Sequence, residues 1–188
     1  MQNRDYVLII FISIWLCALL VSGLLALFYS IRIKGYKTIN NEYLKKFQEK
    51  QKDFKLEKVN INYKLPDTEV CYFNQNAIKI YYRKRKKEKA DNKLRISDYK
   101  YYYNDNKLTS EFANLFLTNK HLVIEFKQKY LKVELKNIVS LICYTFYIGD
   151  WIKGIELVLA NKRYLFDLED VNLVLSFNEL IKEQENGK

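Results

Sequence analysis

Residues 6–31 read YVLIIFISIWLCALLVSGLLALFYSI, and none of these 26 positions carries a formal charge. As an α-helix this run would be about 39 Å long, enough to cross the ~30 Å hydrocarbon core of a bilayer with some tilt. Its large apolar side chains are spread around every face, so the run is not amphipathic. The side chains that we expect to anchor it in lipid are Tyr6, Trp15, Leu20, Phe28 and Tyr29. The sequence therefore predicts a retained transmembrane helix over residues 6–31.

Three other interpretations of this run are less consistent with its residues. A cleaved signal peptide would have a shorter apolar core followed by polar sequence, whereas this run stays apolar through Phe28. A lipoprotein site at Cys17 would need small residues before it, but Ile14, Trp15 and Leu16 stand there. A buried core helix of this length would be unusual in a chain of 188 residues.

The charges that flank the run predict its orientation. The first five residues contain one basic side chain, whereas six follow the run closely: Arg32, Lys34, Lys37, Lys45, Lys46 and Lys50. The positive-inside rule assigns the more basic flank to the cytoplasm. We therefore expect a single-pass protein of the cell membrane, with residues 1–5 outside and the C-terminal domain in the cytoplasm. The three cysteines, Cys17, Cys71 and Cys143, form no CxxC pair, which favours free thiols in a reducing compartment.

The segment after the run, residues 32–68, is basic and partly helical in pattern. We expect Gly35 to end the first helix and Thr38 to cap a second, juxtamembrane helix. Apolar side chains then recur at helical spacings: Ile39, Tyr43, Phe47 and Phe54. This helix either lies on the anionic leaflet or against a partner, or serves as a spacer that packs one stripe on the next domain, which we favour. Residues 59–67, with the single proline, read as a linker.

From residue 69 onward the pattern changes to that of short strands. Val, Ile, Leu, Tyr and Phe fill a series of segments that are separated by turn-like Asn and Lys residues. The predicted strands are 77–83, 94–103, 112–117, 121–126, 130–135, 139–147, 154–159 and 163–168. Residues 84–93, which are mostly charged, read as the tip of the first hairpin.

The last segment returns to a helical period. Asp170 can cap a helix whose apolar stripe is broad enough to plug a sheet or a barrel. The stripe consists of Val171, Val174, Leu175, Asn178 and Ile181, widened by Phe177 and Leu180. We therefore expect a mainly β fold with α: an N-terminal transmembrane helix, a juxtamembrane helix, and a β-barrel or sandwich capped by a C-terminal helix.

Two stretches resemble motifs of GRAM and bacterial pleckstrin-homology-like (PH-like) domains. Residues 113–124, ANLFLTNKHLVI, resemble the strand, turn and following strand of that family, with His121 where an arginine is usual. Residues 131–141, LKVELKNIVSL, are similar to the next strand and the corner after it. The resemblance covers about residues 69–184. It implies a PH-like barrel that serves as an interaction module, often lipid-facing, without catalytic activity.

The segment YYRKRKKEK, residues 81–89, is the strongest candidate for a binding site. Six of its nine residues are basic: Arg83, Lys84, Arg85, Lys86, Lys87 and Lys89. Each basic side chain near an anionic surface adds about 1 kcal/mol of attraction, screened over a Debye length of ~8 Å. Because a tethered domain stays close to lipid, even a weak patch could remain engaged with anionic lipid or an acidic protein partner. The alternative is a solvated hairpin that is lysine-rich because the whole chain is.

Other candidate residues have simpler structural explanations. Tyrosines near the basic segment could stack nucleic-acid bases, but strand geometry favours the core or a partner interface, so we do not expect a nucleic-acid partner. These tyrosines are Tyr81, Tyr82, Tyr99, Tyr101, Tyr102 and Tyr103. His121, the only histidine, lacks the convergent partners of a general base or metal ligand. Helix capping accounts for the acids at 167–170. Trp151, which we expect on an exposed loop, is a candidate hot spot for a partner or for membrane insertion, but it could equally fold back over the barrel.

These patterns predict a membrane-tethered PH-like module, residues 69–188, that binds anionic lipid or a protein partner at the inner leaflet. The alternative is a structural or docking subunit of a membrane-bound assembly. The sequence contains no catalytic or metal-binding constellation and no cofactor motif, so we expect neither an enzyme nor a cofactor. Homo-oligomerisation stays open at this level.

Overall fold

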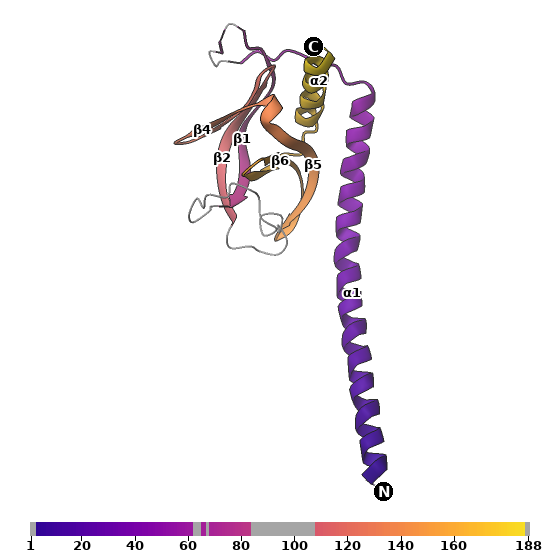
Figure 1. The fold of residues 1–188 in the computed structure, drawn as a ribbon. Coiled ribbons are helices and arrows are strands. Elements are labelled where there is room, and N and C mark those ends of the chain that lie inside the picture. Colours follow the sequence, from indigo (N-terminus) through magenta and orange to yellow (C-terminus); the bar gives the residue numbers. More distant parts are fainter. Residues whose placement is uncertain (1–2, 62–64, 67, 84–107, 187–188) are drawn as a thin grey trace. The chain divides into compact units, whose positions relative to one another are not determined.

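A computed structural model describes residues 3–61, 65–66, 68–83 and 108–186 of the chain (Figure 1). In chain order the elements are α1 (Asn3–Lys52), β1 (Cys71–Arg83), β2 (Leu108–Thr118), β3 (His121–Phe126), β4 (Tyr130–Glu134), the 3₁₀ helix η2 (Leu135–Asn137), β5 (Ile138–Ile148), β6 (Asp150–Leu159), β7 (Arg163–Asp167) and α2 (Asn172–Asn186). The chain divides into two units, Met1–Thr38 and Ile39–Lys188, so the last turns of α1 belong to the β-rich unit.

The expected break at Gly35 is wrong, because α1 continues without interruption to Lys52. Among the described glycines only Gly149 has the positive φ of a helix-terminating glycine. A glycine inside a helix costs only about 1 kcal/mol relative to alanine, so it need not end the helix. Thr38 is not a cap either, since its hydroxyl donates a hydrogen bond to the carbonyl oxygen of Lys34 one turn earlier, 3.1 Å away.

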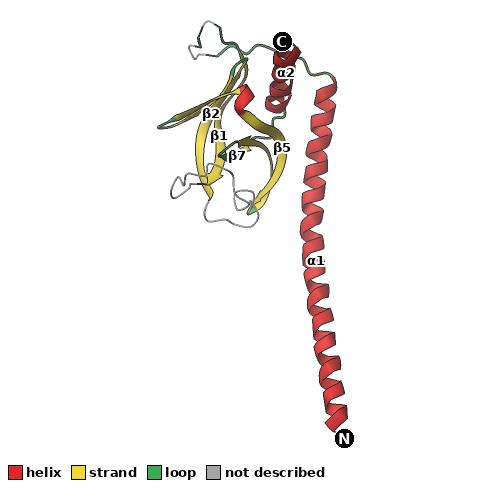
Figure 2. Cartoon of the chain, in the orientation of Figure 1, coloured by secondary structure: helices red, strands yellow, loops and turns green. Residues whose placement is uncertain are grey.

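The seven strands form one antiparallel sheet in the order β4-β3-β2-β1-β7-β6-β5. Two meanders, β1 to β4 and β5 to β7, lie side by side because β1 pairs with both β2 and β7. The sheet curls into a half-barrel, and α2 packs at one end of it (Figure 2). The sequence prediction of a β-rich fold with a C-terminal helix is confirmed at this level.

The core lies on the face of the curled sheet against which α2 packs. Alternate residues of each strand point inward, as in β3, where Leu122, Ile124 and Phe126 are buried and their neighbours are partly exposed. Helix α2 covers this face with Leu173, Val174, Phe177 and Leu180, which confirms the predicted amphipathic helix. Its start is capped as expected, because the backbone N–H of Asn172 donates to a carboxylate oxygen of Asp170, 3.1 Å away.

The described strands lie close to the predicted ones, but β1, β2 and β6 begin earlier, with β2 starting at Leu108 and β6 at Asp150. β1 begins at Cys71, six residues before the predicted strand, because a register shift between Gln75 and Ile78 interrupts its alternation. At that shift Ala77 has φ 54°, and its backbone N–H donates to the side-chain oxygen of Asn114 on β2. The predicted strand over 94–103 and the hairpin tip over 84–93 lie outside the described residues.

Candidate functional site

The N-terminal part of α1 exposes its apolar side chains. Trp15, Leu20 and Phe28 each expose about two thirds of their surface, at 65%, 68% and 67%. The remaining predicted anchor residues, Tyr6 and Tyr29, are exposed as well. Leaving large apolar side chains in water forfeits roughly 1.5–3 kcal/mol each relative to burial. Within the described part of the chain, α1 is the one helix that is long and apolar enough to cross a membrane.

The last turns of α1 are attached to the barrel by Tyr43. Its side chain is 1% exposed and packs with Val171 and Leu175 at the start of α2. The phenol donates to the carbonyl oxygen of Gly154 at 3.0 Å, with the carbonyl oxygen of Leu168 at 3.5 Å. Burial raises the pKa of this phenol above its ordinary range, so Tyr43 is a neutral donor at every physiological pH.

A layer of ion pairs surrounds Tyr43. Lys46 lies 3.1 Å from a carboxylate oxygen of Glu169, and Lys50 lies 3.5 Å from Asp170. Lys153 on β6 joins the same group, 3.4 Å from Glu42 and 3.6 Å from Glu169. The hydrogen bond from Lys46 lowers the pKa of Glu169, with burial opposing it and Lys153 adding to it. We call these residues, together with Tyr43, the clasp.

Contacts around Tyr43 account for most of the apolar stripe that the sequence shows over residues 39–54. Phe47 and Phe54 pack beside Tyr43, and Phe47 also reaches the main core. Half-buried Cys143 of β5 packs against the same cluster, and burial raises the pKa of its thiol. This arrangement agrees with the interpretation of residues 39–52 as a spacer that packs one stripe on the next domain.

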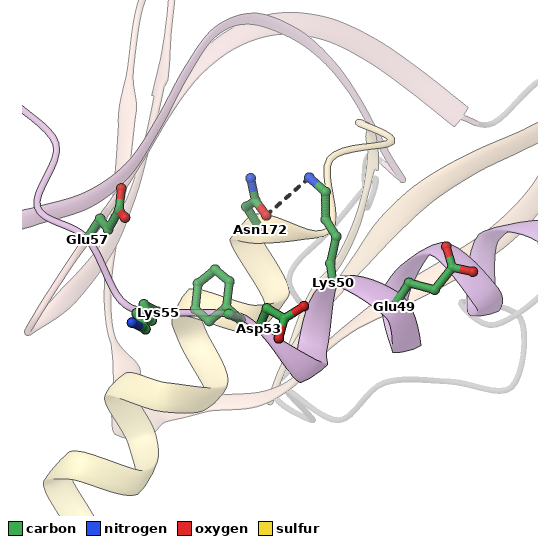
Figure 3. A pocket seen from close by; sticks show the side chains of 7 residues that line it. Glu49, Lys50, Asp53, Lys55, Glu57 and Asn172 are labelled. Atoms are coloured by element: carbon green, nitrogen blue, oxygen red, sulfur yellow. Dashed lines mark hydrogen bonds between the residues drawn. The ribbon is translucent and has the colours of Figure 1, made fainter.

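A shallow depression lies beside the clasp, where α1 ends and α2 begins (Figure 3). Figure 3 shows Lys50 of α1 pointing to Asn172 of α2, whose side-chain oxygen lies 3.3 Å from the Lys50 amine. Acidic and basic side chains alternate around it: Glu49, Lys50, Asp53, Lys55 and Glu57. Because these charges nearly balance and the depression is open to solvent, it offers no built site for a small ion or cofactor.

The face of the sheet opposite the main core carries a second, smaller cluster. Tyr81 and Phe146 meet edge to face with ring centroids 5.9 Å apart, and Leu165 between them is fully buried. Beside this cluster Glu156 of β6 and Arg163 of β7 form an ion pair whose side chains are each 6% exposed. A buried pair of this kind is costly to break, although it contributes little net stability.

Tyr82 is also packed and hydrogen bonded, so its ring is not available to stack with nucleic-acid bases. Its ring lies against Phe126 and Tyr164, at centroid distances of 6.1 and 5.8 Å. Its phenol donates to a carboxylate oxygen of Glu111, and burial together with this bond raises its pKa. Lys129 lies 5.0 Å from the centre of the same ring. The expectation that Tyr81 and Tyr82 belong to packed clusters is confirmed, and the other four tyrosines lie outside the described residues.

His121 lies in a polar network at the start of β3. Its Nδ1 is 3.0 Å from a carboxylate oxygen of Glu69, which Lys132 also contacts at 3.1 Å. Thr118 donates to the second oxygen of Glu69, 3.1 Å away. Burial acts to raise the pKa of Glu69, but the contacts from Lys132, His121 and Thr118 together hold it below the usual range. The network ties the segment before β1 to the β2–β3 turn.

Only some of the predicted site residues lie in the part of the chain that the structure describes. Arg83 is the last residue of β1, and the basic side chains of 84–89 lie outside the described residues. Trp151 is not on a loop, because β6 begins at Asp150 and Trp151 pairs across the hairpin with Tyr147, ring centroids 5.2 Å apart. The turn takes place at Gly149, whose φ is 76°.

No group of three or more His, Cys, Asp or Glu side chains that could hold a metal ion occurs among the described residues. Compared with the models of known protein families and with curated proteins, the sequence matches none. The clasp is the feature that sequence reasoning missed. Lys46, Glu169 and Asp170 were visible separately, but nothing in the sequence indicates that segments 120 or more residues apart pair with each other.

Proposed function

We propose that this protein is a single-pass membrane protein whose C-terminal module binds anionic lipid or a protein partner at the cytoplasmic leaflet, without catalysis. The observation that carries the proposal is the exposed apolar surface of α1 over residues 6–31. A helix of that length and surface is at its lowest free energy in a bilayer. The basic flank from Arg32 onward supports a cytoplasmic C-terminus by the positive-inside rule.

We also propose that residues 69–184 form a PH-like domain. Two observations support this: seven meandering strands followed by a C-terminal helix, and the motif-like stretches over 113–124 and 131–141. The first stretch spans the β2–β3 hairpin, and the second runs through β4 and η2 into β5. A fold of this type would present its loops, not its core, to a partner.

Lipid binding by the basic segment can be tested in the full-length protein. Nanodiscs of phosphatidylcholine and nanodiscs rich in phosphatidylserine are compared by amide hydrogen exchange of peptides that cover residues 81–93. We expect exchange to be slower, on the order of tenfold, in the anionic discs, since four basic side chains near the surface contribute several kcal/mol at most. Charge reversal of Lys84, Arg85, Lys86 and Lys87 to Glu should abolish the difference.

The matched control reverses two lysines in other turns, Lys127 and Lys162, and should leave the difference intact. Equal exchange in both discs for the unmodified protein would contradict lipid binding and favour the second candidate function. That candidate is a docking block in a membrane-bound assembly. It is favoured by the balanced charge of residues 101–188, which carry a net charge of about −1 and so form no general anionic-lipid surface. Its test is purification from mild detergent, where a stoichiometric protein partner should accompany the chain.

A further inference from the structure

The clasp has two layers of different strength. The inner layer is the buried ring and hydroxyl of Tyr43. The outer layer consists of ion pairs whose members are substantially solvated: the side chains of Lys46 and Lys50 are 42% and 43% exposed, and Glu169 is 51% exposed. Exposed ion pairs contribute about 0–1 kcal/mol each and weaken with salt. The outer layer is therefore held by interactions that other anions can replace.

The lysines of the clasp can reach a second anionic surface when α1, which is continuous to Lys52 in the structure, bends between the apolar run and Ile39. Along a straight helix Lys46 would lie ~22 Å beyond Ile31, so the exchange includes such a bend. The segment Ile39–Lys52 begins eight residues after the apolar run of α1 ends at Ile31. In the proposed function that run is in a bilayer, so the segment stays at high effective concentration near lipid head groups. An anionic leaflet attracts each lysine near its surface by about 1 kcal/mol, which is comparable with an exposed ion pair.

The same segment is built for such a surface. Ile39, Tyr43 and Phe47 share one stripe with Lys46 and Lys50 beside it, whereas Lys45 and Lys52 lie on the opposite side of the helix. Apolar side chains on one face with lysines alongside are typical of helices that lie in the head-group layer of anionic membranes. When the clasp is closed, Tyr43 of this stripe packs instead against Val171, Leu175 and Cys143.

We propose that Ile39–Lys52 is a two-position element that exchanges the acidic barrel face for the phosphates of an anionic leaflet. In one position Lys46 and Lys50 pair with Glu169 and Asp170, and Tyr43 fills its pocket. In the other position the same lysines contact lipid phosphates, and the face formed by Glu169, Val171 and Leu175 becomes accessible. This inference rests on the proposed membrane attachment and adds a regulator to it: the anionic lipid content sets which face of the barrel is open.

The chain contains a native reporter for this exchange. Cys143 packs against the Tyr43 cluster and is half-buried, so opening of the clasp exposes its thiol. Cys71 is 2% exposed inside the barrel and reacts only if the barrel itself unfolds. Cys17 lies within the apolar run and is replaced in a Cys17→Ser background. The rate at which a neutral maleimide modifies Cys143, relative to Cys71, therefore measures clasp opening alone.

The experiment compares full-length Cys17→Ser protein in nanodiscs of phosphatidylcholine and in nanodiscs rich in phosphatidylglycerol. Two lysines at about 1 kcal/mol each predict modification of Cys143 faster by roughly tenfold or more in the anionic discs. An anionic surface lowers the thiolate fraction of a nearby cysteine, so the charge of the lipid on its own would slow the reaction. Faster modification of Cys143 in the anionic discs therefore measures the exchange, because a direct effect of lipid charge on the thiol would have the opposite sign.

Matched variants separate the clasp from other lysines. Glu169→Gln removes a barrel partner without changing any lysine, and we expect faster modification of Cys143 already in phosphatidylcholine. Lys46→Gln with Lys50→Gln should raise the rate in phosphatidylcholine and remove most of the response to anionic lipid. Lys45→Gln with Lys52→Gln, on the same helix but without barrel partners among the described residues, should keep the parent rate in phosphatidylcholine.

Equal Cys143 rates in the two kinds of disc would overturn the exchange, and so would modification of Cys71 in step with Cys143. Both results leave membrane attachment intact. Failure of the underlying proposal is a separate outcome, because a protein that does not enter nanodiscs and is extracted from membranes without detergent lacks the attachment itself.

Discussion

The phenol of Tyr43 donates a hydrogen bond to the carbonyl oxygen of Gly154, 3.0 Å away, although 111 residues separate the two in the sequence. This bond joins the last turns of α1 to β6. Tyr43→Phe keeps the ring and removes the bond, so the free energy of unfolding should fall by about 1 kcal/mol. Tyr43→Ala also empties the pocket and should cost about 3 kcal/mol or more. Denaturation in detergent, followed by near-ultraviolet circular dichroism, measures both, and an unchanged Tyr43→Ala variant would contradict the docking of α1.

Gly154 is required at its position by close neighbours. A Cβ atom there would clash with the ring of Phe146 and with the backbone carbonyl oxygen of Phe166. The backbone of β7 cannot yield cheaply, so we expect Gly154→Ala to destabilise the barrel by about 2 kcal/mol, within the range for overpacked cores. Gly149→Asn is the comparison variant. Nothing lies near its Cβ position, and Asn is among the side chains that best accept a positive φ, so its backbone strain should cost less than the clash at Gly154. Equal melting temperatures for the two variants would contradict this packing.

The buried pair of Glu156 and Arg163 should behave non-additively. Each single change, Glu156→Leu or Arg163→Met, leaves an unpaired buried charge and should cost about 3–5 kcal/mol. The double variant removes both charges and should recover most of that loss, because apolar side chains of similar size often replace a buried pair without cost. A double-mutant cycle from denaturation midpoints measures the coupling, and simple additivity of the two losses would refute the pairing.

The clasp should weaken in acid. Because the hydrogen bond from Lys46 lowers the pKa of Glu169 below its ordinary 4.5, the folded state favours the ionised carboxylate. Its contribution is complete above that value and is lost as the pH falls through the lower, folded-state pKa. The parent protein and Glu169→Gln should therefore differ in unfolding free energy at about pH 6 and converge as the pH falls through the lowered pKa of Glu169. A difference that does not depend on pH would mean that Glu169 acts without its charge.

Local patterns in the sequence were sufficient for most of the fold. Alternation of apolar residues placed β3 at residues 121–126, and the helical stripe after Asp170 placed α2. Turn glycines were harder to interpret, because a glycine can end a helix, continue it, or make room for a neighbour. Gly35 continues α1, Gly149 makes the β5–β6 turn, and Gly154 accommodates Phe146. Only the backbone angles and the packing distinguish these roles.

The candidate site was less accessible to sequence reasoning. The stripe that contains Tyr43 and Phe47 was visible, and so was the acidic group that contains Glu169. Their meeting depends on how the sheet curls, which brings the start of α2 beside β6 and gives Lys153 two acidic partners. Pairings over such sequence distances leave no periodic trace, and therefore the clasp could be found only in three dimensions.

The proposed function depends most on the apolar run of α1 spanning a bilayer, and extraction of cell membranes with alkaline carbonate tests this directly. We predict that the full-length protein stays in the membrane pellet, whereas a variant with Leu20→Asp and Leu24→Asp, two exposed positions of the run, is released. Recovery of the unmodified protein in the carbonate supernatant would contradict the account.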